Sequence, residues 1–349
     1  MRFARISTRL IAGLVTHLAF ALGASAFEIE DRRQYPAEDG ARELRIISTA
    51  DAPVFEPIIR AFQVAHPDVA IDYVIASSTE LMKAISEEEA DFDLAISSAM
   101  DLQTKLANDG FALDYRSEAT DALPKWAKWH DQIFAFTQEP AVMVIAEGAF
   151  ANRPAPRTRD DLIAMLRDNP AEFDGRIGTY DVRISGAGYL FATQDSRNTD
   201  SYWRLTEVMG RLNAQLYSGS KAMIEDVAAG RLALAYNVVG SYAAQRLADT
   251  PGIRIVPFED FLSVMLRTAL IPKNAQNIED AGRMIDFLVQ LNQREDIEQE
   301  TYLAPVNAQS LNENNAARPI RLGPGLLVFL DRLKKETFLR NWENAIVQK

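Results

Sequence analysis

Short apolar runs alternate with segments of helical period from residue 43 onward. Runs rich in β-branched residues predict buried strands, and apolar positions spaced three and four apart predict amphipathic helices. Strands are predicted at 43–48, 69–75 and 92–97, and helices at 53–65, 79–88 and 101–108. Parallel neighbours need crossover connections, which place helices on the sheet faces, so the alternation predicts a doubly wound α/β sheet.

A second α/β unit follows the first and opens with an apolar run at 141–146. The pattern predicts further strands at 177–180, 232–236, 253–257 and 264–271, and helices at 158–169, 200–215, 220–229 and 277–291. The expected fold is therefore α/β with two doubly wound lobes. Residues 28–42 are a polar lead in which no element is predicted.

The first 26 residues have the pattern of a secretory signal peptide. Three arginines between residues 2 and 9 precede a largely apolar stretch at 10–22 and small residues at 24–26. A membrane anchor is the alternative, but Thr16 and His17 interrupt the apolar run, which is shorter than the roughly 20 residues of a spanning helix. We therefore expect cleavage after residue 26 and a periplasmic protein.

Composition excludes several classes of function. The 349 residues carry a net charge of −12, and removing the three signal arginines leaves 34 basic against 49 acidic residues. This excess argues against nucleic acid as a partner. Cysteine is absent, which excludes thiol catalysis and thiolate metal sites. No nucleophile with a base, paired histidines or metal-ligand spacing stands out, so we expect no enzyme, cofactor or metal.

Small polar residues follow each of the first three predicted strands. The carboxyl ends of parallel strands meet at one edge of the sheet, where helices begin and ligands bind. Hydroxyls and free N–H groups at helix starts bind carboxylate or phosphate oxygens, although the same residues also cap their own helices. The ligand-binding candidates here are Thr49, Ala50, Asp51, Ser77, Ser78, Thr79, Ser97 and Ser98.

A glycine-containing turn after the strand at 177–180 is the most specific signal. Gly186, Ala187 and Gly188 allow backbone amides to approach an anion closely, and Ser185 adds a hydroxyl. Arg183 offers a charge-assisted contact, with a surface arginine beside a plain turn as the alternative. The spacing of a nucleotide-binding loop is absent from this stretch.

Two later junctions add polar and aromatic candidates. Tyr217 precedes a predicted helix, Tyr236 ends the predicted strand at 232–236, and Asn237 follows that strand. The amide of Asn237 can donate and accept hydrogen bonds, and the tyrosines can stack on a ligand or donate to it. The alternative for such tyrosines is a place in the core.

The order of these segments resembles the type II periplasmic solute-binding proteins of ABC importers, the group with ferric-iron, sugar-phosphate and phosphoglycerate-system members. The resemblance extends from about residue 43 to 320, through FDLAISSAMDLQTKLANDG, YDVRISGAGY and GRLALAYNVVGSYAA. It implies two lobes joined by crossing strands near 134–142 and 261–267, and closure by a hinge. Lobe one would then contain 43–135 and 266–320, and lobe two 136–265.

The resemblance implies binding of a small anionic solute, an organophosphate or a carboxylate, by a monomer that delivers it to an ABC permease. The iron-binding branch uses an adjacent tyrosine pair, which the run from Tyr236 to Tyr242 lacks, so iron is the weaker expectation. Residues 321–349 predict an amphipathic helix that packs on a lobe or docks a membrane partner. Signalling to the periplasmic domain of a sensor kinase therefore stays open beside transport.

Overall fold

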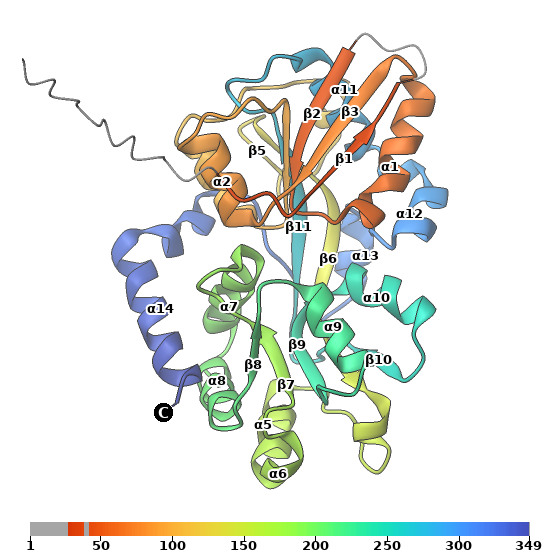
Figure 1. Ribbon diagram of the computed structural model, residues 1–349. Helices are drawn as coiled ribbons and strands as arrows, with labels where there is room; N and C mark the ends of the chain where they lie inside the picture. Colours follow the sequence, from red (N-terminus) through yellow and green to blue (C-terminus); the bar gives the residue numbers. More distant parts are fainter. Residues whose placement is uncertain (1–26, 38–41, 349) are drawn as a thin grey trace, which may run out of the picture.

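The computed structural model describes residues 27–37 and 42–348, which form two lobes stacked one above the other (Figure 1). The predicted signal peptide lies outside these residues. Within the described ranges, no helix has the length and apolar character needed to cross a membrane. The strand order β1-β3-β2-β4-β11-β6-β9-β7-β8 runs through both lobes.

The upper lobe is built from the three predicted strand and helix units. β2 pairs in parallel with β3 on one side and with β4 on the other. The elements are β2 Arg42–Ser48, α1 Ala52–Ala65, β3 Val69–Ile75, α2 Ser78–Ser86, β4 Leu94–Ser97 and α3 Met100–Asn108. Two short elements follow in this lobe before the chain crosses, α4 Glu118–Asp121 and β5 Lys128–Trp129, and the chain later returns to it with α11 Ile278–Val289 and α12 Glu295–Thr301. After these come α13 Ala308–Glu313 and β12 Ala317–Pro319, which pairs with β11.

The polar lead also contains a strand that the apolar pattern did not predict. β1 (Asp31–Tyr35) pairs antiparallel with β3 at the edge of the upper sheet. Most of its residues are exposed because an edge strand has one neighbour, so the strand needs few apolar side chains. Arg32 anchors it through two hydrogen bonds to the buried Asp72, at 2.7 and 2.6 Å.

The lower lobe holds a second sheet with helices around it. β7 pairs in parallel with both β8 and β9. The elements are α5 Arg159–Asp168, α6 Pro170–Phe173, β7 Ile177–Tyr180, α7 Gly186–Asn198, α8 Ser201–Arg211, β8 Gln215–Tyr217, α9 Ser220–Ala228, β9 Leu234–Val239, α10 Gly240–Asp249 and β10 Ile253–Val256. The predicted helix at 200–215 ends early, because Asn213 takes a positive φ of 51° that turns the chain into β8.

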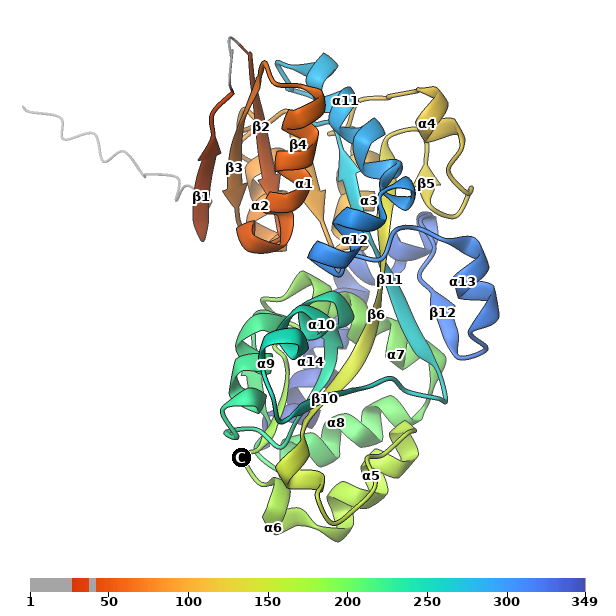
Figure 2. The same ribbon diagram turned by 90° about the vertical axis from the view of Figure 1, so that its right-hand side faces the viewer.

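Two antiparallel strands cross between the lobes (Figure 2). β6 (Ile133–Ala146) pairs with β11 (Leu262–Leu270) on the upper side and with β9 and β10 on the lower side. The crossings expected near 134–142 and 261–267 fall on these two strands. The lobe boundaries drawn from them stay a prediction.

The C-terminal segment contacts both lobes. The 3₁₀ segment η3 (Pro324–Leu330) packs on α3 of the upper lobe, whereas α14 (Arg332–Ile346) packs on α8 of the lower lobe. Phe338 and Trp342 are buried in the lower core, and a Cβ on Gly210 of α8 would lie 2.2 Å from the carbonyl of Ala345. The helices therefore touch through their backbones.

Asp101, at the start of α3, is a buried carboxyl that makes stability depend on pH. It is 3% exposed, and its Oδ1 has no hydrogen-bond partner within the described part of the chain. Burial raises its pKa to about 7, although the N–H of Leu102 and the charge of Lys335 oppose this. The unfolded carboxyl titrates near ~3.9. Below about pH 4 the carboxyl is protonated in both states and its burial does not reduce the free energy of unfolding. As the pH rises from about 4 to about 7, the free energy of unfolding falls, because only the unfolded carboxyl can ionise freely.

We expect Asp101→Asn to stabilise the protein by roughly 2 kcal/mol at pH 8, because the amide removes the buried charge. The gain should shrink steadily between pH 7 and pH 4.5. Thermal unfolding across this range measures it, with the exposed Asp114→Asn as the control. A gain that is equal at all pH values would contradict the titration of Asp101.

Candidate functional site

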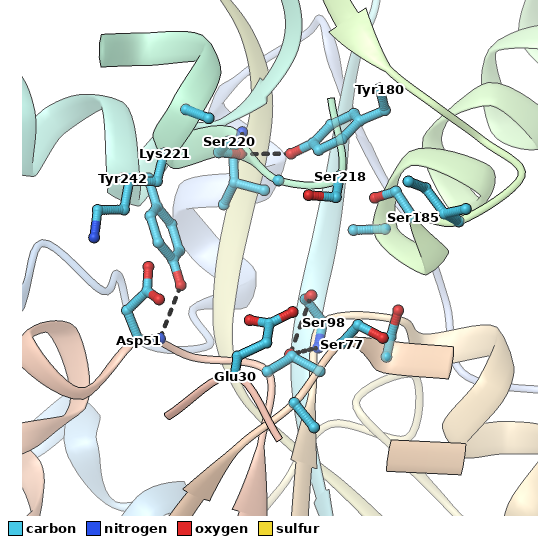
Figure 3. Close-up of a pocket in the computed structure, with 18 of the residues that line it drawn as sticks. Glu30, Asp51, Ser77, Ser98, Tyr180, Ser185, Ser218, Ser220, Lys221 and Tyr242 are labelled. Carbon is cyan, nitrogen blue, oxygen red and sulfur yellow. Dashed lines mark hydrogen bonds between the residues drawn. The ribbon is translucent and has the colours of Figure 1, made fainter. Parts of the chain in front are cut away.

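A cavity of about 290 Å³ lies between the lobes, where the strands of both sheets end (Figure 3). β2, β3 and β4 direct their carboxyl ends downward into it, and β7, β8 and β9 direct theirs upward. The upper side is lined by Glu30, Thr49, Asp51, Ala76, Ser77, Ser78 and Ser98. The lower side is lined by Tyr180, Ile184, Ser185, Ala187, Ser218, Gly219, Ser220, Lys221, Ala222, Glu225, Val239 and Tyr242, and β11 adds Arg267.

Seven of the residues proposed from the sequence line this cavity: Thr49, Asp51, Ser77, Ser78, Ser98, Ser185 and Ala187. Some of them also cap helices. The Ser77 hydroxyl accepts the Glu80 N–H at 3.2 Å, and the Ser185 hydroxyl accepts the Gly188 N–H at the same distance. A hydroxyl that accepts one bond keeps its own proton to donate, so capping leaves the Ser185 hydroxyl able to donate to a ligand.

Two backbone N–H groups join the lobes on opposite sides of the cavity. The Asp51 N–H of the upper lobe donates to the Tyr242 hydroxyl of α10 at 3.2 Å. The Gly186 N–H, at the start of α7, donates to the Ser78 hydroxyl of α2 at 3.1 Å. The lobes are therefore in direct contact on either side of the cavity.

Gly186 allows this approach because it has no side chain. A Cβ at this position would lie 2.2 Å from the Ser78 hydroxyl oxygen and 3.1 Å from the Ala99 Cβ. We expect Gly186→Ala to weaken solute binding at least roughly tenfold while leaving thermal stability nearly unchanged, because the clash arises only between the lobes. Calorimetric titration measures the affinity. Gly148→Ala, whose Cβ would meet nothing within 4 Å, is the matched control. Unchanged affinity in the Gly186→Ala protein would contradict the role of this contact.

Four other residues proposed from the sequence do not line the cavity. Ala50 is completely buried, the Ser97 hydroxyl accepts the Ala99 N–H at 3.1 Å, and Thr79 lies beside the Ser77 hydroxyl. A Cβ on Gly188 would lie 2.3 Å from the Tyr180 Cβ, so this glycine serves close packing of helix on strand. The hydroxyls of Ser97 and Thr79 therefore lie in local hydrogen bonds, and the space beside Gly188 is filled by Tyr180.

Arg183 also lies outside the cavity lining. Its guanidinium forms ion pairs with Asp181 at 2.7 Å and with Glu343 of α14 at 2.9 Å. Because the two carboxylates already neutralise the guanidinium, it fastens the C-terminal helix to the lower lobe.

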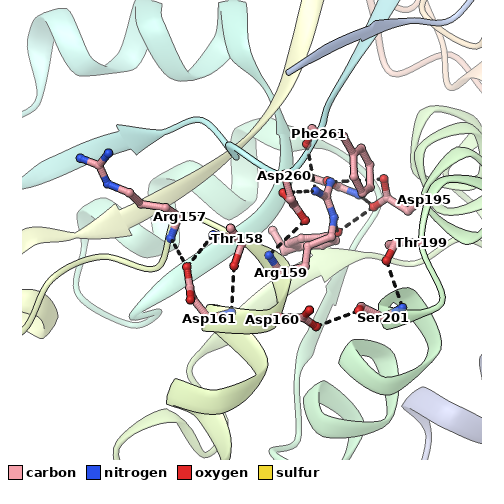
Figure 4. Close-up of polar contacts among 12 residues, drawn as sticks. Arg157, Thr158, Arg159, Asp160, Asp161, Asp195, Thr199, Ser201, Asp260 and Phe261 are labelled. Atoms are coloured by element: carbon pink, nitrogen blue, oxygen red, sulfur yellow. Dashed lines mark hydrogen bonds and ion pairs between the residues drawn. The ribbon is translucent and has the colours of Figure 1, made fainter. Parts of the chain in front are cut away.

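Tyr217, Tyr236 and Asn237 do not line the cavity and form hydrogen bonds within the lower lobe. The Tyr217 hydroxyl donates to Asp226 at 2.5 Å. The Tyr236 hydroxyl and the Asn237 amide both donate to the buried Asp195, each at 2.7 Å. Asp195 also pairs with Arg159, the centre of the polar network in Figure 4. All three side chains therefore have partners within the lower lobe, and Tyr236 and Asn237 are buried there.

Sequence reasoning missed Arg267, which reaches the cavity from a crossing strand. It is 1% exposed, and its Nε and Nη2 donate to Glu139 of β6 at 2.9 and 3.2 Å. Glu139 also accepts from Ser241. The Arg267 Nη1 has no acceptor among the residues that the structure describes. An arginine inside an apolar strand has no local signal that links it to a ligand.

Three carboxylates line the cavity. Glu30, Asp51 and Glu225 line it together with Lys221, and the last three also line an adjoining cavity of about 210 Å³ beside α1. Burial raises the pKa of Asp51, and burial together with the charge of Asp51 raises that of Glu30. Across residues 27–37 and 42–348, no cluster of three or more histidine, cysteine or acidic side chains is arranged to hold a metal ion.

The described geometry matches known proteins. The family model of bacterial extracellular solute-binding proteins matches residues 91–321. The substrate-binding protein of an ABC transporter from Agrobacterium tumefaciens is 33% identical, with a TM-score of 0.85 over 90% of this chain and 98% of that one. No curated protein matches this chain.

Two more distant structures share the fold. One is the periplasmic binding protein AfuA from Actinobacillus pleuropneumoniae, with fructose-6-phosphate bound. It is 15% identical, with a TM-score of 0.68 over 89% of this chain and 99% of that one. Iron-bound HitA from Pseudomonas aeruginosa is 16% identical, with a TM-score of 0.65 over 87% and 99%.

Proposed function

This chain belongs to the bacterial extracellular solute-binding proteins, which serve ABC transporters, and we propose that its solute is a small anion, an organophosphate or a carboxylate. Family membership implies a periplasmic location and a permease as partner. We also propose that β6 and β11 bend to close the lobes over the solute, and that the protein acts as a monomer.

The start of α9 is the observation that carries this proposal. Its N-cap is Gly219, which supplies no capping side chain, and Lys221 and Ala222 of its first turn line the cavity. Uncapped N–H groups and the positive end of the helix dipole favour an anion at this place. The hydroxyls of Ser98, Ser185 and Ser218 surround the same space and can donate to its oxygens.

Iron is the weaker candidate on the same geometry. The two phenols that line the cavity are already in hydrogen bonds: the Tyr180 hydroxyl pairs with Ser220 at 2.5 Å, and the Tyr242 hydroxyl accepts the Asp51 N–H. The iron-bound relative is 16% identical, a level of identity that supports the fold alone.

A thermal-shift screen tests the proposal with phosphate esters, carboxylates and ferric citrate. A ligand that binds only the folded protein at 100 times its Kd stabilises it by about 2.7 kcal/mol, so an organic anion should raise Tm by a few degrees. Ser98→Ala should weaken the best anion roughly fivefold, because one donor is lost. Ser86→Ala is its control, since that hydroxyl donates to the Met82 carbonyl away from the cavity. A response to ferric iron alone would rule out an anionic solute.

A further inference from the structure

Resting on the proposed function, we infer that the solute is a zwitterion. Its anionic group lies against the hydroxyls and the start of α9, and a cationic group, such as a primary ammonium, lies between Glu30 and Asp51. These two carboxylates select the solute by its positive charge.

The N-terminal strand places Glu30 in the cavity. β1 runs antiparallel to β3, with Asp31 opposite Ile75 at the end of β3 that faces the lower lobe. The Glu30 N–H donates to the Ile75 carbonyl at 2.8 Å, which holds the residue at this edge. Figure 3 shows its carboxylate pointing into the space between the lobes. The residue just before this edge strand therefore adds a charged side chain to the cavity.

The carboxylates that line the cavity have no close partner. Glu30, Asp51 and Glu225 make no side-chain hydrogen bond or ion pair with any residue that the structure describes, although the charges of Lys221 and Arg267 act on Asp51 and oppose the rise in its pKa. Lys221 is the single cationic side chain lining the cavity, among the described residues, that is not already paired, because Arg267 is paired with Glu139. Three carboxylates against one free ammonium repel a simple anion, whereas a solute with its own positive charge would compensate them.

The unpaired N–H donor of Arg267 indicates an anionic group on the solute. Its Nη1 is a buried N–H group without an acceptor among the described residues, on a side chain that lines the same cavity. A buried donor without a partner is costly unless an acceptor meets it. The same cavity thus presents N–H and O–H donors and also negatively charged carboxylates, Asp51 among them. A small molecule that satisfies both carries both charges.

Isothermal titration of the mature protein tests this with five probes. Phosphoethanolamine and γ-aminobutyrate carry both charges, ethyl phosphate and butyrate lack the ammonium, and ethanolamine lacks the anion. We expect at least one zwitterion to bind roughly tenfold or more tightly than its amine-free partner, which is the effect of one well-placed charge pair. Glu30→Gln and Asp51→Asn should each remove most of this preference and leave the weaker affinity for the amine-free probe unchanged or improved.

Glu28→Gln is the matched control. Glu28 lies two residues upstream on the same exposed segment, and its backbone N–H, not its side chain, bonds to Glu80. This variant should keep the full preference, and equal Tm values for all variants show that each is folded.

The outcomes separate the two proposals. If the paired probes bind equally and Glu30→Gln changes nothing, the zwitterion is wrong and the anionic solute stands. If ethanolamine binds as tightly as phosphoethanolamine, the anionic function itself is wrong. If none of the five probes binds, both proposals are contradicted.

Discussion

Arg159→Ala will lower the free energy of unfolding by about 3–5 kcal/mol, the range for removing one partner of a buried ion pair. Arg159 is completely buried in the lower lobe. Its Nε donates to the Tyr236 hydroxyl at 2.8 Å, and its Nη1 donates to Asp260 at 3.0 Å and to the Phe261 carbonyl at 2.9 Å (Figure 4). The guanidinium carbon also lies 3.5 Å from the centre of the Phe261 ring.

The loss of stability arises chiefly from the buried Asp195 carboxylate, which the substitution leaves without a cation. Asp195 is 0% exposed and would lose its only cationic neighbour within the described structure, at 3.4 Å, while the charge stays out of water. Urea unfolding followed by circular dichroism measures the change. Arg157→Ala is the control, because this neighbouring arginine is 70% exposed and its pair with Glu259 is worth little. A loss below about 1 kcal/mol for Arg159→Ala would contradict the role of the network.

Glu139→Ala should destabilise the protein by a similar amount, about 3–5 kcal/mol, because it leaves Arg267 charged and unpaired between the crossing strands. Both side chains are 1% exposed, and their closest approach is 2.9 Å. Arginine stays protonated inside proteins, so the unpaired guanidinium would remain charged and its burial would lower the stability. Thr137 and Ser241 would also lose the carboxylate that accepts their hydroxyl protons.

A double variant distinguishes the cost of an unpaired buried charge from a loss of packing between the crossing strands. Glu139→Leu combined with Arg267→Met should recover most of the stability, since a buried pair replaced by apolar side chains of similar size is often neutral. Urea unfolding of the single and double variants completes the cycle. Arg332→Ala, which breaks an exposed pair with Glu336, is the control and should change stability by less than about 1 kcal/mol. A double variant as unstable as Glu139→Ala alone would contradict this account.

The candidate site was partly predictable because its framework is local. A small polar residue that follows a strand and begins a helix lies at the edge of the sheet, as at Ser77 and Ser185. The same pattern could not tell a ligand contact from a cap or a packing residue. Gly188 and Ser97 satisfy their own loops, and nothing in their immediate sequence separates them from Ser98.

The proposed polar residues that lie outside the cavity lining have partners far away in the chain. Arg183 binds Glu343, 160 positions later, and Asn237 binds Asp195, 42 positions earlier. A local motif shows which hydrogen bonds a side chain can make, but not which partner the fold brings to it. Glu30 and Arg267 were not predicted because nothing in their local sequence links them to a ligand. Glu30 lies in a polar lead and Arg267 in an apolar strand.

The amino-acid sequence by itself determined the alternation of strands and helices, hence the α/β class and the edge where a ligand binds, because apolar periodicity and helix starts are local properties. Only the tertiary structure decided the charge of the cavity. It brought Glu30 from just before an edge strand, Asp51 from a helix start and Arg267 from a crossing strand to one space. Such a charge balance arises from contacts between distant segments, and no single segment of the chain contains it.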